Sequence, residues 1–136
     1  MEVIAKFNCA KVPKLSYLNQ VFNCCFIRNF FLILNMRIIA KSTIRDFWLL
    51  HPPAEFPLLD WYNTVKQAEW SSPNDVKQTY GNASIVANDR VVFNIKGNDY
   101  RLVTEIDYSF QMVFIIWIGT HKAYDKIDVR TIEYNG

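Results

Sequence analysis

A chain of 136 residues fits one ordinary domain, and a composition of 51% hydrophobic and 15% aromatic residues is enough to bury a core, which excludes a disordered protein. The net charge of +2 is uneven: residues 1–35 hold four basic residues and one acidic residue, which leaves 11 basic and 12 acidic residues (net −1) in residues 36–136. A domain with so little net charge does not bind nucleic acid through its overall field, so any RNA contact must depend on a local basic patch.

The cysteines indicate neither a metal site nor a disulfide framework. Cys9, Cys24 and Cys25 all lie before residue 36, and an odd count without Cys-x-x-Cys spacing matches neither pattern. No other pattern indicates a cofactor. The cysteine-free remainder suits a reducing cytoplasm, where we expect the protein to act.

Residues 1–35 differ in character from the rest of the chain. The stretch 21–34 is apolar but is interrupted by Asn23, Arg28 and Asn29. A bilayer span needs about 20 consecutive apolar residues, and a charge in its middle costs about 2.5–3.5 kcal/mol. The stretch also lacks the uninterrupted apolar core and the small-residue cleavage site of a signal peptide. We interpret residues 1–35 as an extension upstream of a true start at Met36, and residues 36–136 as the domain; translation from Met1 leaves open a membrane-attached protein.

From Met36 onward, the hydrophobic pattern predicts a strand followed by helices. Residues 37–40 are a first strand, and Ser42 can cap a short helix that ends at residues 51–53, where two prolines stop it. A second helix is predicted over residues 54–70, and a single helical turn follows the cap at Ser72. The predicted core-facing residues of the two longer helices are Ile44, Phe47, Trp48, Leu49 or Leu50, Leu58, Trp61 or Tyr62, Val65 and Ala68.

The remainder predicts a sheet. Strands are expected over residues 84–87, 90–96 and 100–107, with a tight hairpin turn at Gly97-Asn98. Residues 112–119 are so apolar and β-branched that we expect a strand buried on both faces. A strand, a helical hairpin and then antiparallel strands predict the α+β class, with the helices packed on one side of a small, mainly antiparallel sheet.

Polar side chains gather directly after the most apolar strand. Residues 120–125 read Thr-His-Lys-Ala-Tyr-Asp, so an imidazole, an ammonium, a phenol and a carboxylate lie within six positions. Polar groups at the end of a buried strand are held by a rigid scaffold. A histidine that titrates near neutrality, beside lysine and tyrosine, can move protons around a phosphate.

Two segments together resemble the sequence signatures of the HigB toxins, of the RelE/ParE superfamily of type II toxin–antitoxin systems. They are residues 92–103 (VFNIKGNDYRLV) and 119–127 (GTHKAYDKI), and the resemblance covers about residues 36–128. It implies a RelE-like fold and a small cytoplasmic ribonuclease, an mRNA interferase that enters the ribosomal A site and cuts translated messenger RNA. It also implies a helix-turn-helix antitoxin, HigA-like, as the neutralising partner, and no membrane.

The side chains are compatible with metal-free RNA cleavage, in which the substrate's own 2′-hydroxyl is the nucleophile. Such a reaction needs a base, cations that stabilise the phosphorane, and an acid for the departing 5′-oxygen. His121 could be the acid or the base, and Tyr124 a proton donor or a stacking face for an unpaired base. Arg101 could clamp the phosphate, because the hairpin can bring it alongside the strand end that bears His121. Further RNA contacts are expected from Lys122, Lys96 and Asn94.

Each of these residues also has a purely structural interpretation. His121 could bond a backbone carbonyl, Lys122 could be a solvated charge, and Arg101 could form an ion pair with Glu105 or Asp99. Thr120 and Asp125 are expected to be structural. An alternative function is that of a non-catalytic RelE/ParE-type protein that inhibits a target such as gyrase through protein contacts, which would not need His121, Tyr124 and Arg101 together.

Overall fold

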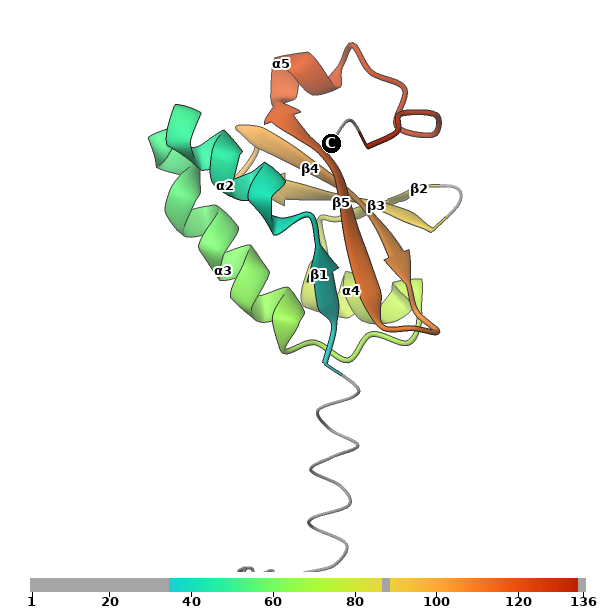
Figure 1. The fold of residues 1–136 in the computed structure, drawn as a ribbon. Coiled ribbons are helices and arrows are strands. Elements are labelled where there is room, and N and C mark those ends of the chain that lie inside the picture. The colour runs from blue at the N-terminus through green and yellow to red at the C-terminus, as the bar shows by residue number, and fades with distance from the viewer. Residues whose placement is uncertain (1–34, 87–88, 135–136) are drawn as a thin grey trace, which may run out of the picture. The chain divides into compact units, whose positions relative to one another are not determined.

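Residues 35–86 and 89–134 are described in a computed structural model of the chain. Five strands form one sheet in the order β1-β5-β4-β3-β2 (Figure 1). The strands are β1 (Arg37–Ile39), β2 (Ser84–Val86), β3 (Arg90–Ile95), β4 (Tyr100–Asp107) and β5 (Met112–Thr120). β1 pairs with β5 in parallel, and the other neighbours are antiparallel. The α+β class and the mainly antiparallel sheet are therefore confirmed.

The helices lie between β1 and β2 in the sequence, apart from one short helix after β5. They are α2 (Lys41–Leu50), the 3-10 turn η1 (Pro52–Ala54), α3 (Glu55–Lys66), α4 (Pro73–Thr79) and α5 (His121–Tyr124). No helix in the described part of the chain is both long and apolar enough to cross a bilayer. The stretch 21–34, on which a membrane anchor depended, lies outside the described residues.

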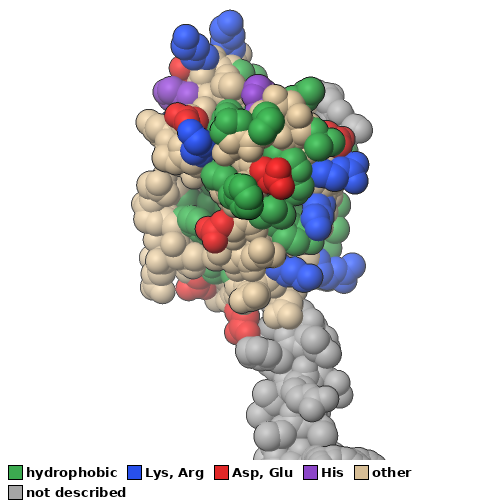
Figure 2. Space-filling model, turned by 90° about the vertical axis from the view of Figure 1, so that its left-hand side faces the viewer, with side chains coloured by type: hydrophobic (Ala, Val, Ile, Leu, Met, Phe, Trp, Pro, Cys, Tyr) green, Lys and Arg blue, Asp and Glu red, His purple; other side chains and the backbone are tan. Residues whose placement is uncertain are grey.

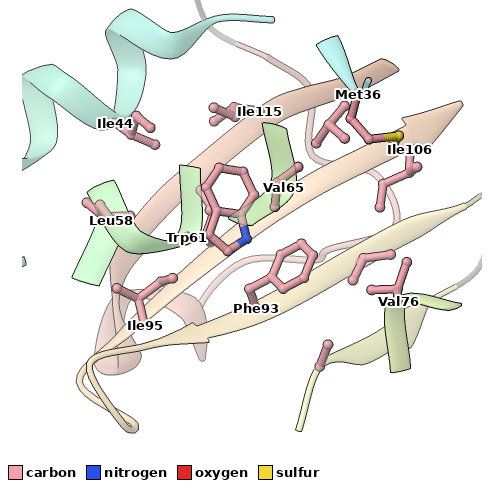
Figure 3. Close-up of a cluster of buried hydrophobic side chains, with 14 of the residues drawn as sticks. Met36, Ile44, Leu58, Trp61, Val65, Val76, Phe93, Ile95, Ile106 and Ile115 are labelled. Carbon is pink, nitrogen blue, oxygen red and sulfur yellow. The ribbon is translucent and has the colours of Figure 1, made fainter. Parts of the chain in front are cut away.

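One core joins the helices to a single face of the sheet (Figure 3). On α3, residues 58, 61 and 65 recur at helical spacing, and all three side chains are buried. The Trp61 indole meets the Phe93 ring edge to face, with 5.4 Å between ring centroids, an arrangement that aromatic pairs favour. The sheet contributes alternate residues to this core: Phe93, Ile95, Leu102, Ile106, Val113 and Ile115. The prediction that the helices pack on one side of the sheet is confirmed.

Three helix boundaries differ from those predicted. Ser42 is not the cap of α2, because Ala40 occupies the N-cap position with φ of 69° and no side chain caps the helix. The helix predicted to reach residue 70 ends at Lys66, since the chain must bend to bury Trp70, whose Nε1 donates to Thr79 Oγ1 at 3.0 Å. α4 continues to Thr79 instead of making a single turn.

The cap predicted before α4 is present, and it is reciprocal. The Asp75 carboxylate accepts from the backbone N–H of Ser72 at 3.1 Å, while Ser72 accepts in return, so the pair forms a capping box. Hydrogen bonds from Ser71 lower the pKa of Asp75 below its usual value, which keeps the carboxylate charged at the positive end of the helix.

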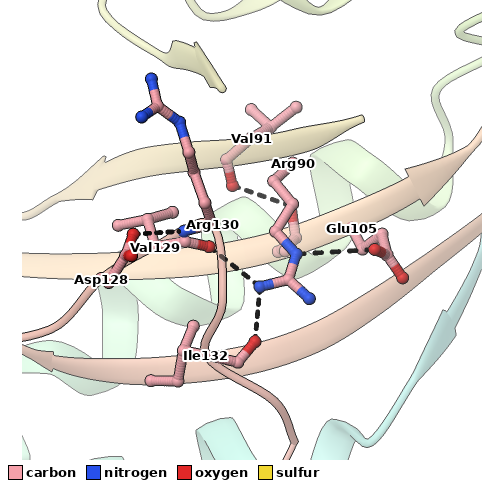
Figure 4. A network of polar contacts seen from close by, with 8 residues as sticks. Arg90, Val91, Glu105, Asp128, Val129, Arg130 and Ile132 are labelled. Carbon is pink, nitrogen blue, oxygen red and sulfur yellow. Dashed lines mark hydrogen bonds and ion pairs between the residues drawn. The ribbon is translucent and has the colours of Figure 1, made fainter. Parts of the chain in front are cut away.

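The face of the sheet opposite the helices is here called the outer face; it carries Arg90, Val92, Asn94, Arg101, Val103, Glu105, Phe114 and Trp117. The C-terminal segment crosses part of it, held by Arg90, which donates from Nη1 to the carbonyls of Val129 (2.9 Å) and Ile132 (Figure 4). Val92 and Val103 are buried, whereas Phe114 and Trp117 are only half-buried. The prediction that residues 112–119 are buried on both faces is therefore wrong for the outer face of β5.

A β-bulge in β5 changes which side chains reach the outer face. Val103 pairs with Trp117 but Thr104 pairs with Ile115, so Ile116 is an extra residue without a partner on β4. Residues 113 and 115 face the helices, and without the bulge residue 117 would follow them into the core. The bulge instead directs Trp117 outward.

Candidate active site

Three elements meet at one end of the sheet: the tip of the β3–β4 hairpin, the end of β5, and α5. Arg101 lies opposite Asn94 on β3 and opposite Gly119 on β5, so these three positions form one row across the outer face. The backbone N–H of His121 donates to Asp99 O at 3.0 Å. The expectation that the hairpin brings Arg101 alongside the strand end bearing His121 is thus confirmed at the level of the backbone.

Arg101 contacts an aromatic ring and forms no ion pair with any described residue. Its guanidinium carbon lies 5.7 Å from the centroid of the Tyr124 ring, within cation–π range, and Nη1 donates to Asn98 O at 3.3 Å. The two carboxylates expected to compete for it are paired with other cations: Glu105 with Arg90 at 3.5 Å, and Asp99 with Lys96 at 2.7 Å. The structural ion pair considered for Arg101 is therefore absent among the described residues.

α5 is a single helical turn that presents His121 and Tyr124. Thr120 caps it, since its hydroxyl accepts from the Ala123 N–H at 3.2 Å. The side chains of His121 and Lys122 are exposed, and Tyr124 is half-buried. The structure brings Arg101 and Tyr124 together, whereas the His121 imidazole is exposed on the same turn and makes no hydrogen bond within the described residues. Thr120 is structural, as predicted, and Asp125 follows the last turn.

The two other predicted RNA contacts already have partners. Hydrogen bonding to the Asp99 carboxylate raises the pKa of Lys96, so this ammonium is charged at every physiological pH. Asn94 donates from Nδ2 to Asn82 O at 3.3 Å on the same face as Arg101. RNA would have to share or displace these contacts, whereas Arg101 and Lys122 have no ion-pair partner in the described chain.

Sequence reasoning missed two residues of this site, Trp117 and Gly119. The Trp117 indole lies directly over Gly119, so closely that a Cβ on the glycine would collide with the ring. The ring also lies near Tyr124, with 6.4 Å between centroids. The apolar pattern of residues 112–119 predicts burial on both faces, which assigns residue 117 to the core, and only the bulge places it here.

The charges at this end of the sheet favour the binding of an anion. Residues 96–101 and 121–126 hold four cations, Lys96, Arg101, Lys122 and Lys126, against the two carboxylates of Asp99 and Asp125. Figure 2 shows one face of the molecule, on which Lys and Arg lie mainly at the top and along the right-hand edge, and apolar side chains with a few carboxylates lie between them. At the opposite end of β4, a cavity of about 290 Å³ is lined by Asp89, Glu105 and Asp107, which would repel a phosphate. An RNA contact through a local basic patch, as expected from sequence, is therefore better placed at α5 than at this cavity.

No group of three or more His, Cys, Asp or Glu side chains that could hold a metal ion occurs in residues 35–86 and 89–134. The residues that meet at α5 are instead a guanidinium, a phenol and an imidazole. These groups can bind a phosphate and exchange protons with it.

Comparison with known proteins identifies the family. Residues 54–127 match the family model described as HigB_toxin, the RelE-like toxic component of a toxin-antitoxin system. The "mRNA interferase HigB" of Escherichia coli O6:H1 is 24% identical over 94 residues, which span 68% of this chain and 91% of the relative. The "mRNA interferase toxin HigB" of Escherichia coli K12 and the "mRNA interferase HigB" of Shigella flexneri are each 25% identical over 92 residues, 66% of this chain and 88% of theirs. The matched residues include the whole of the site at α5, and the chain belongs to the HigB toxin family.

Proposed function

We propose that this chain is the toxin of a type II toxin–antitoxin system and an endoribonuclease that cuts messenger RNA on the ribosome, with its active site at α5. The observation that carries the proposal is the Arg101–Tyr124 pair on the outer face, with His121 on the same helical turn as Tyr124. The relatives are named mRNA interferases, and this chain matches 91% and 88% of the length of two of them, which supports the activity.

The reaction uses the RNA's own 2′-hydroxyl. A base removes the 2′-proton, the 2′-oxygen attacks the adjacent phosphorus, and an acid protonates the 5′-oxygen as the P–O5′ bond breaks, which leaves a 2′,3′-cyclic phosphate. Arg101 binds the phosphate oxygens and stabilises the extra charge of the phosphorane, because a guanidinium can donate two parallel hydrogen bonds to it. His121 and Tyr124 are the proton-carrying groups, both presented by the single turn of α5.

The neighbouring cations extend the RNA-binding surface. Lys122 is exposed next to His121 in the sequence. Lys96 lies at the tip of the β3–β4 hairpin, and this tip is joined to α5 by the hydrogen bond from His121 N to Asp99 O. A strand of RNA that follows the outer face from β3 to α5 would pass Asn94 and Lys96 before reaching Arg101. Together these groups bind phosphates without reading sequence, so codon choice would come from elsewhere.

The partners follow from the same proposal. The cognate antitoxin is a helix-turn-helix protein, HigA-like, that neutralises the toxin by direct binding. The messenger RNA is presented in the ribosomal A site, and the toxin acts in the cytoplasm.

Induced expression tests the function. The chain started at Met36 is induced beside the full chain and beside His121→Ala and Arg101→Ala variants, and 5′ ends of a translated message and of a matched message without a start codon are mapped. We expect growth arrest and cuts in the translated message alone, with both relieved in the variants. Growth arrest with intact messages would instead indicate a non-catalytic inhibitor. Cuts in both messages would show that cleavage does not require translation of the message by the ribosome.

A further inference from the structure

Trp117 occupies a position that depends on the absence of a side chain at residue 119. Two of its ring carbons lie too close to the point where a Cβ on Gly119 would be for that Cβ to fit, and a third lies 3.2 Å from that point. The φ of Gly119 is not in the left-handed region, so the backbone itself does not require glycine there. The glycine is needed because the six-membered ring of the indole takes the space that a side chain at residue 119 would fill.

The same indole connects the two partners of the proposed active site. Arg101 lies opposite Gly119 in the β4–β5 register, on the same face of the sheet as the indole that covers the glycine. Tyr124 meets the indole from α5, with 48° between the ring planes, and its ring also faces the Arg101 guanidinium. Arg101, Trp117 and Tyr124 thus form one continuous contact group on the outer face.

Tyr124 needs such support because its own helix is too short to hold it. α5 comprises four residues with one side-chain cap at Thr120, and a single turn has little stability of its own. None of its residues is buried. The position of the Tyr124 ring is therefore set by what it packs against, and the Trp117 indole is the aromatic ring in contact with it among the described residues.

We propose that Trp117, seated on the bare backbone of Gly119, is a positioning residue that holds Tyr124 against Arg101 in the geometry that RNA cleavage requires. The inference rests on the proposed nuclease function. Gly119 has a role as well, because it leaves the space that the Trp117 indole occupies; the glycine therefore affects cleavage only through the tryptophan. A methyl group at residue 119 displaces the indole, and the displaced indole no longer supports Tyr124.

The test is a double-mutant cycle in the full chain. Gly119→Ala, Trp117→Ala, the double variant and Trp117→Phe are compared with the unchanged protein in single-turnover cleavage of a message bound to ribosomes. We expect Gly119→Ala and Trp117→Ala each to lower the maximal rate about tenfold, with the half-saturating toxin concentration unchanged. The double variant should be within about twofold of Trp117→Ala, because the added methyl then meets empty space, and Trp117→Phe should regain most of the rate.

Gly81→Ala is the matched control. A Cβ at Gly81 would meet one atom, Lys77 O, at 4.0 Å, so this substitution should leave the rate unchanged. Thermal unfolding of each variant identifies any that fail to fold, and Trp117→Phe, which keeps an aromatic ring on the glycine, carries the test if Trp117→Ala does not fold.

Other outcomes overturn the inference in distinguishable ways. If Gly119→Ala is as harmful in the Trp117→Ala background as alone, the glycine serves the RNA directly. If the half-saturating concentration rises at an unchanged maximal rate, Trp117 stacks on RNA and does not position Tyr124. If the unchanged protein cuts no RNA, the proposed function fails; the NMR shift of the Arg101 Nε–H, which the Tyr124 ring current displaces, then decides the inference. It should move in Gly119→Ala but not between Trp117→Ala and the double variant.

Discussion

Replacing Arg90 by alanine should release the C-terminal segment from the sheet. The Arg90 side chain is 11% exposed, and its guanidinium donates to the carbonyls of Val129 and Ile132 while its Nε faces Glu105 at 3.5 Å (Figure 4). These bonds tie residues 129–132 to β3, about forty positions earlier in the sequence. In the described structure, Arg90 is the side chain that donates to this segment.

The size of the effect follows from the three contacts. A hydrogen bond from a charged donor contributes about 1.5–3 kcal/mol, and two such bonds are lost. Glu105 adds little, because its side chain is 41% exposed and water replaces the ion pair. The segment gains conformational freedom once it is released, which offsets part of the loss. We therefore expect the free energy of unfolding to fall by about 3 kcal/mol.

Urea unfolding of the full chain measures this change, and Arg130→Ala is the control. Arg130 lies in the same segment with an exposed side chain, so its removal should change stability by no more than about 0.5 kcal/mol. Cleavage by Arg90→Ala, measured where it remains folded, should stay close to normal, because Arg90 pairs with Glu105 at the end of β4 away from Arg101. A fall of less than about 1 kcal/mol in the free energy of unfolding would refute the reasoning, since it would mean that the hydrogen bonds of Arg90 to the C-terminal segment do not stabilise the fold.

Three further predictions concern the site and the core. Arg101→Ala should lower cleavage about 100- to 1000-fold in the single-turnover assay and leave the urea midpoint nearly unchanged, because its one hydrogen bond in the described structure is long; a large fall in the midpoint with normal cleavage would make Arg101 structural. Burial raises the pKa of Tyr108 from 10.0 to about 12, so the stability that the protonated phenol contributes is complete below pH 10 and is lost as pH rises toward 12. Because the side chain is only half-buried and solvent screens its charge, this loss should be about 1 kcal/mol. Tyr108→Phe should lack this alkaline loss in urea titrations at pH 9 and pH 11.5, and equal losses in both proteins would contradict the assignment. Cleavage should persist when a chelator removes transition metals such as Zn²⁺ and the Mg²⁺ that ribosomes require is kept, because the RNA's own hydroxyl is the nucleophile; loss of cleavage that added Zn²⁺ restores would reveal a metal step.

Much of the fold was predictable because its patterns are local. The helical spacing on α3 placed Leu58 and Val65 in the core, and both are buried; alternate residues of β3 and β4 share one face, and Phe93, Leu102 and Ile106 are buried on it. Boundaries failed where distant contacts competed with local preference. Trp70 leaves the predicted helix to reach the core, and Ala40 adopts a left-handed conformation that its residue type does not favour.

The candidate site was predictable only in part, for the same reason. The polar run at residues 120–125 and the partner residue Arg101 could be identified from sequence, and their roles as catalytic or RNA-contacting residues stay predictions. Trp117 could not be identified, because its assignment to the outer face depends on the bulge between β4 and β5. A bulge is a property of the pairing of two strands, so neither strand indicates it alone.

The class of the fold, the order of strands and helices, and the family can be derived from the sequence alone, because they depend on hydrophobic periodicity and on motifs that lie within short stretches of the chain. Which cations remain without a carboxylate partner depends on how the chain folds. Lys96 and Arg90 are paired, whereas Arg101 faces Tyr124. The tertiary structure also gathers an excess of cations around α5, although the net charge of the chain is only +2. Charge pairing and side-chain stacking act between segments that are distant in sequence, and the register of β3, β4 and β5 is what brings them together.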